Sequence, residues 1–109
     1  MTVTDFAKKA GFKTITLPNP DKEICGVYVG DLLSWVMGKA ESGNLWITIM
    51  SNINILAVAT LTDSSCILLA ENVVPDEELI KRAKEKGVNV LSTHLSAYDA
   101  AIKTAEIIG

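Results

Sequence analysis

The run Cys66–Ala70 places the strongest limit on how this chain can fold. All of its residues are apolar, and polar residues flank it on both sides, at 62–65 and at 71–72. A strand with no polar position has no face for water and is covered on both sides. The run therefore predicts a buried central strand of a parallel sheet.

Strand and helix patterns alternate around this central run. From residue 45 onward, they predict strands and helices in turn at 45–49, 53–62, 66–70, 75–86, 88–91 and 97–108. Regular alternation with short connections implies parallel strands, joined by right-handed crossovers and covered by helices. A chain of 109 residues has room for one such core. We therefore predict an α/β domain of two or three layers, with a mostly parallel sheet and alternating β-α units.

The first part of the chain adds further elements. Its patterns predict a helix that ends at Gly11, strands at 13–17 and 24–29, and a helix at 32–40 capped by Asp31.

Composition excludes several classes of protein. The formal net charge is -3, whereas proteins that bind nucleic acids concentrate lysine and arginine to neutralise phosphates. No apolar run approaches the roughly 18 residues of a membrane span, and charged residues interrupt the first 20 positions, so neither a membrane anchor nor a signal peptide is expected. Cys25 and Cys66 form no CxxC pair and have apolar neighbours, which favours buried, reduced thiols. We expect a cytoplasmic protein.

Several segments together resemble the DRTGG domain family. They are GDLLSWVM at 30–37, LWITI at 45–49, NINILAVA at 52–59, PDE at 75–77 and GVNVLST at 87–93. The family is similar in fold to the N-terminal domain of HPr kinase/phosphorylase. Its members also lie between CBS repeats in certain inorganic pyrophosphatases, where they help to form dimers. The resemblance implies a regulatory or dimerising α/β domain at 24–109, with 1–23 as an N-terminal extension packed on it.

The chain departs from the family at the positions that give the family its name. Members usually carry Asp-Arg after the strand that matches 45–49, and Thr-Gly-Gly after the strand that matches 66–69. Here these places hold Met50-Ser51-Asn52 and Ala70-Glu71-Asn72. No ligand role of those arginine and glycine residues can be transferred to this chain.

Polar loops follow three of the predicted strands. Parallel sheets bind ligands outside the carboxyl ends of their strands, and helix N-termini there offer N–H groups to anions. The candidate ligand-binding residues are Ser51, Asn52, Asn54, Glu71, Asn72, Ser92, Thr93 and His94. These loops suggest a sensor for a nucleotide or a small anionic metabolite. The alternative is that serine and asparagine only cap helices, and Glu71 would oppose an anion.

Catalytic and cofactor motifs are missing from the sequence. His94 is the only histidine, and its nearness to Ser92 and Thr93 suggests a base beside a nucleophile. However, no G-x-S-x-G turn surrounds Ser92, and no phosphate-binding G-x-x-x-x-G-K-[ST] loop or cluster of metal ligands is present. We expect no enzyme activity, no cofactor and no metal.

Excess apolar helix surface favours association with another protein. The predicted helix at 53–62 has almost no polar face, and the last helix is rich in alanine and isoleucine. The candidate interface residues are Ile53, Ile55, Leu56, Val58 and Ala59. For Trp35 and Trp46, core packing is favoured over an interface role. The preferred function is that of a non-catalytic regulatory domain that forms a homodimer or acts through a protein partner.

Overall fold

The computed structural model describes residues 1–109 and contains five strands and five helices. The strands are β1 (Lys13–Thr16), β2 (Val27–Val29), β3 (Leu45–Thr48), β4 (Cys66–Leu69) and β5 (Val90–Ser92). The helices are α1 (Val3–Ala10), α2 (Leu33–Lys39), α3 (Asn54–Leu61), α4 (Glu77–Lys86) and α5 (Ala97–Ile108). Every element expected from the sequence is present, although its ends can differ by a few residues. None of the helices is long and apolar enough to cross a membrane.

The five strands form one sheet in the order β1-β5-β4-β3-β2. Strands β2 to β5 are parallel, whereas β1 pairs antiparallel with β5 at one edge. The apolar strand β4 lies in the middle, between β3 and β5, and all four of its residues are buried. The α/β fold with a mostly parallel sheet is therefore confirmed.

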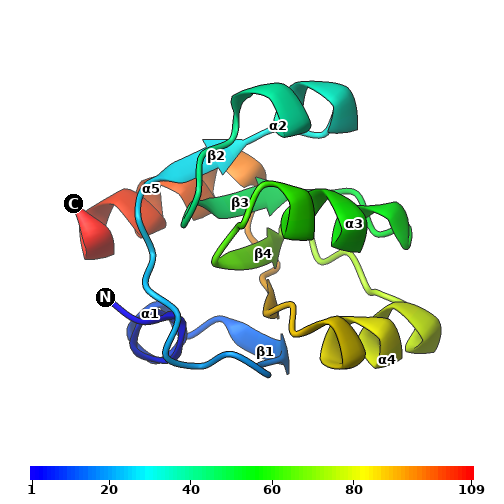
Figure 1. The fold of residues 1–109 in the computed structure, drawn as a ribbon. Coiled ribbons are helices and arrows are strands. Elements are labelled where there is room, and N and C mark those ends of the chain that lie inside the picture. Colours follow the sequence, from blue (N-terminus) through cyan, green and yellow to red (C-terminus); the bar gives the residue numbers. More distant parts are fainter.

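Helices cover both faces of the sheet, which gives the domain three layers (Figure 1). On one face, Trp46, Ile67 and Leu69 pack with residues of α2, α3 and α4. On the other face, Leu45, Ile47 and Leu68 pack with residues of α1 and α5. This division follows from the alternation of side chains along each strand.

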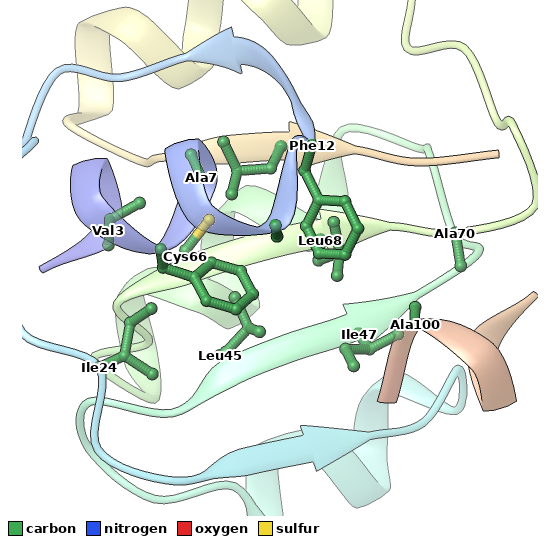
Figure 2. Packing of buried hydrophobic residues seen from close by; sticks show 13 residues of the cluster. Val3, Ala7, Phe12, Ile24, Leu45, Ile47, Cys66, Leu68, Ala70 and Ala100 are labelled. Atoms are coloured by element: carbon green, nitrogen blue, oxygen red, sulfur yellow. The ribbon is translucent and has the colours of Figure 1, made fainter. Parts of the chain in front are cut away.

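The N-terminal segment, residues 1–23, is part of the same core. Val3 and Phe6 of α1 are fully buried, and in Figure 2 the Phe12 ring lies beside Leu68, whereas Val3 and Ala7 lie nearer Cys66. The buried Asn89 makes a further connection between this segment and the sheet. Its side-chain N–H donates to the backbone oxygen of Asn19 (2.7 Å), and its oxygen accepts from the Asn19 N–H (2.9 Å).

Helix ends explain why most element boundaries could be predicted. Asp76 caps α4 by accepting from the N–H of Leu79 at 2.8 Å, and Gly11 and Gly87 close α1 and α4 in the left-handed conformation. The prediction that Asp31 caps α2 is wrong, because α2 has no side-chain cap. The carboxylate of Asp31 instead accepts from the Thr48 hydroxyl (2.7 Å) and from the N–H of Ile49 (2.9 Å).

Helix α3 corrects the predicted interface. Ile55, Leu56, Val58 and Ala59 are buried within the chain's own core, so they cannot contact a second molecule while the domain is folded. The sequence alone did not show this, because an almost entirely apolar helix hides which of its faces meets the sheet. Of the five predicted interface residues, only Ile53 is exposed.

Two further predictions about burial are wrong and two are confirmed. Trp46 is fully buried and its ring N–H donates to the backbone oxygen of Gly30 at 2.9 Å, whereas Trp35 is 58% exposed. Lys39 lies over the Trp35 ring at 5.2 Å. Both cysteines are free, but only Cys66 is buried and Cys25 is exposed. Burial raises the pKa of the Cys66 thiol well above its ordinary value.

Candidate ligand site at the carboxyl edge of the sheet

The chain leaves β4 and β5 toward opposite faces of the sheet. After β4 it continues to α4, which packs with Trp46 and Ile67, and after β5 it continues to α5, which packs with Leu45 and Leu68. Parallel sheets bind ligands where neighbouring connections diverge in this way. The carboxyl ends of β4 and β5 are therefore the natural position for a site.

The loops that follow β4 and β5 are joined by backbone hydrogen bonds. The N–H of Glu71 donates to the oxygen of Leu95 (2.8 Å), and the N–H of Asn72 donates to the oxygen of Thr93 (2.9 Å). Glu71 and Asn72 both have left-handed backbones, with φ of 59° and 57°. Residues with a side chain rarely adopt this conformation, which costs on the order of 1–2 kcal/mol each.

A hollow of about 270 Å³ opens beside these loops. It lies between the β5 end of the sheet, the end of α1 and helix α5. Its lining residues are Ala10, Gly11, Phe12, Lys13, Asn72, Ser92, Thr93, His94, Leu95 and Lys103. Four of the predicted ligand-binding residues, Asn72, Ser92, Thr93 and His94, are thus brought together.

The other predicted ligand-binding residues lie outside the hollow. Ser51, Asn52, Asn54 and Glu71 are not among its lining residues. The Asn52 side chain instead accepts from the N–H of Asn54 at 2.9 Å, which stabilises the turn before α3. The three polar loops therefore do not form one site, because the loop after β3 is separated from this hollow.

The hollow carries positive charge without a matching acid. Lys13 and Lys103 line it, no aspartate or glutamate does, and neither lysine forms an ion pair. The ammonium group of Lys103 lies 5.8 Å from the centre of the Phe12 ring, a cation–π geometry that holds the side chain at the hollow. This arrangement favours an anionic ligand.

Neither lysine was among the residues predicted to bind a ligand. Lys13 and Lys103 are far apart along the chain and come together only because β1 pairs with β5 and α1 packs against α5. One signal was present, since Lys103 is the only basic residue of the last helix.

The residues considered for catalysis are not connected as a nucleophile and a base. No hydrogen bond joins His94 to Ser92 or Thr93, and the His94 side chain is exposed. The Thr93 hydroxyl instead accepts from the N–H of Leu95 at 3.2 Å, which makes it part of the turn.

The fold and this edge site define a class of small three-layer α/β domains, and sequence comparison identifies the family. The chain belongs to the DRTGG domain family, which matches residues 24–107. No curated protein matches the chain at a significant level.

A solved structure shares the fold. It is the crystal structure of the CBS and DRTGG domains of the regulatory region of Clostridium perfringens pyrophosphatase, complexed with the activator diadenosine tetraphosphate. The TM-score is 0.73 at 16% sequence identity, and the match covers 94% of this chain and 45% of that one. This chain therefore spans less than half the length of that regulatory region, and the likeness concerns the fold alone.

Proposed function

We propose that this chain is a non-catalytic regulatory domain that associates with a second copy of itself or with a protein partner. Two comparisons support a regulatory role: its DRTGG family membership and its fold likeness to part of a pyrophosphatase regulatory region. The observation that carries the proposal is a group of exposed apolar side chains on β2 and α2. We name these side chains the β2–α2 edge. Val27 and Val29 of β2 lie on the α5 face of the sheet, because they pair with Leu45 and Ile47, whereas Leu32, just before α2, and Trp35 and Met37 of α2 lie on the other face.

The β2–α2 edge combines apolar surface with an open strand. Strand β2 pairs only with β3, so its outer side has unpaired backbone groups. Val29 is 48% exposed and Trp35 is 58% exposed, although such residues are usually buried. Open, uncharged strand edges and exposed apolar patches are typical of association surfaces. In a homodimer, a twofold axis would place this same surface on both partners.

Light scattering after size exclusion tests the association. We expect the wild-type chain to be a dimer at tens of micromolar, and we expect Val29→Lys and Trp35→Glu to be monomers with unchanged circular dichroism. Val74→Lys is a matched control, because Val74 is 79% exposed and lies outside this edge. A wild-type monomer at these concentrations, or equal dissociation by Val74→Lys, would contradict self-association through this edge.

A second function, that of a sensor for a small anion, is favoured by a separate observation. The hollow at the β4 and β5 ends has two lysines and no acid in its lining. A ligand at a hundredfold its dissociation constant stabilises a protein by about 2.7 kcal/mol, which a thermal melt detects. We expect phosphorylated compounds to raise the melting temperature. If no anion stabilises the chain, the sensor function is wrong.

A further inference from the structure

We propose that the hollow binds a small phosphomonoester and that the N-terminal segment supplies part of the site. Lys13 of β1 and Lys103 of α5 would hold the phosphate from two sides. The loops after β4 and β5 would complete the site through Asn72 and His94. This inference rests on the sensor function proposed above and specifies its ligand and its mechanism.

The charge around the hollow supports a phosphate group as the recognised feature. The whole chain has a formal net charge of -3, yet this lining contains two lysines and no carboxylate. Because neither lysine is in an ion pair, no internal partner has to be displaced when a ligand binds. Hydrogen bonds from ammonium groups to phosphate oxygens are among the stronger ones in proteins.

The loops add neutral donors that have no acceptor within the chain. The N–H of Thr93 donates to the oxygen of Leu69 and that of Leu95 donates to the Thr93 hydroxyl, but the N–H of His94 between them has no acceptor. The side-chain amide of Asn72 also makes no hydrogen bond. The left-handed backbone of Asn72 is held by its bond to Thr93, so the loop is ordered before any ligand arrives. Such preorganisation reduces the entropic cost of binding.

The volume of the hollow limits the ligand. It measures about 270 Å³, just below the roughly 300–1,000 Å³ of pockets that enclose drug-sized molecules. This space suits a phosphate with a short polyol or sugar fragment.

The position of the two lysines gives the site a mechanical role. Lys13 belongs to the N-terminal segment and pairs with Ser92 in the sheet, whereas Lys103 lies on the last helix. A phosphate held by both would fasten the N-terminal segment to the part of the chain that the family match covers. Binding should therefore slow amide hydrogen exchange in β1.

Nuclear magnetic resonance titration tests the site directly. We would titrate the whole chain at constant ionic strength with inorganic phosphate, glycerol 3-phosphate, adenosine monophosphate and diadenosine tetraphosphate. We expect saturable amide shifts at Lys13, Asn72 and His94, with glycerol 3-phosphate binding most tightly.

Substitutions separate this site from any other. Lys13→Gln and Lys103→Gln should each raise the dissociation constant about tenfold to a hundredfold, because each removes a charge-assisted bond. Asn72→Asp should also weaken binding, and aspartate tolerates the left-handed backbone. Lys81→Gln, on the exposed side of α4, is the matched control and should leave the dissociation constant unchanged.

The outcomes distinguish this proposal from the sensor function on which it rests. Saturable amide shifts around Asn52 and Asn54, or a dissociation constant that both lysine substitutions leave unchanged, would contradict binding in this hollow. Either result would still be consistent with a sensor function. Tighter binding of either nucleotide would overturn the small-ligand class. No saturable binding by any of the four compounds would overturn both proposals.

Discussion

Glu71 and Asn72 keep a backbone shape that glycine usually adopts. The resemblance to the DRTGG family places a Gly-Gly pair at these positions, and both residues here have φ near +60°. The bonds from their N–H groups to Leu95 and Thr93 hold this shape against the steric cost of a side chain. The loop geometry therefore does not depend on the glycines that this sequence lacks.

Glu71→Gly should stabilise the domain by about 1 kcal/mol, because glycine adopts a positive φ without the clash of a Cβ atom. Urea denaturation followed by circular dichroism measures the difference in the free energy of unfolding. Glu85→Gly makes the same exchange inside helix α4 and should destabilise by about 1 kcal/mol. Destabilisation by both substitutions would contradict the steric explanation.

The two cysteines should react very differently with a thiol reagent. Cys25 is exposed, whereas burial raises the pKa of the Cys66 thiol and so suppresses its thiolate. We expect Ellman's reagent to modify one thiol in the native chain at pH 8, and both thiols in guanidinium chloride. A Cys25→Ser variant should show almost no native reaction. Rapid modification of Cys66 in that variant would show that the core opens readily.

At the scale of secondary structure, Asp31 joins two elements rather than capping one. Its carboxylate accepts from Thr48 and Ile49, which ties the end of β2 to the end of β3. Asp31→Ala should lower the free energy of unfolding by about 1–2 kcal/mol, since it removes two bonds to a charged acceptor. Chemical denaturation gives the value. Asp21→Ala, an exposed aspartate in a loop, should change stability by less than about 0.5 kcal/mol.

Local patterns were sufficient to predict which elements form and in what order. Alternation and caps identified β4 as central and α4 as a helix that ends at Gly87. They could not show which side of α3 meets the sheet, because its apolar residues surround the whole helix. Trp35 was misjudged for a related reason: α2 covers an edge of the sheet, where one side of a helix remains open to solvent.

The candidate site was only partly visible in the sequence. Residues after β4 and β5 could be assigned to one edge, because neighbouring parallel strands end together. Lys13 could not be assigned to this edge, because β1 is antiparallel to β5 and it is therefore the first residue of β1 that lies beside the end of β5. Its position depends on a pairing between the first and last strands, which no local pattern specifies.

At the scale of the whole molecule, the family match at residues 24–107 is smaller than the packed core, which also includes side chains from residues 3–12. Phe6 is fully buried in the core, and the Phe12 ring packs edge-on against the Phe6 ring, with 5.6 Å between the two ring centres. A fragment of residues 24–109 would expose the surface that these rings cover.

We expect the 24–109 fragment to be unfolded or aggregated. Loss of a single buried phenylalanine side chain already lowers the free energy of unfolding by about 3–5 kcal/mol, and the whole free energy of unfolding of a typical domain is about 5–15 kcal/mol. Dispersion of amide signals in a proton–nitrogen spectrum tests this. The full-length Phe6→Ala variant is a milder comparison and should unfold at lower urea concentration. A fragment with well-dispersed signals and the wild-type midpoint would contradict the expectation.

The pairing of β1 with β5 also determines when the domain can complete its folding during synthesis. Helix α1 with Phe6, and the nearby Phe12, are synthesised before β5 and α5, the elements against which this segment packs. Contacts between segments so distant in sequence form slowly, because closing the long loop between them costs entropy before the contacts can stabilise the chain. Until β5 and α5 have been synthesised, the amphipathic, aromatic segment from α1 to Phe12 therefore lacks its native cover, and it is the kind of segment that chaperones bind.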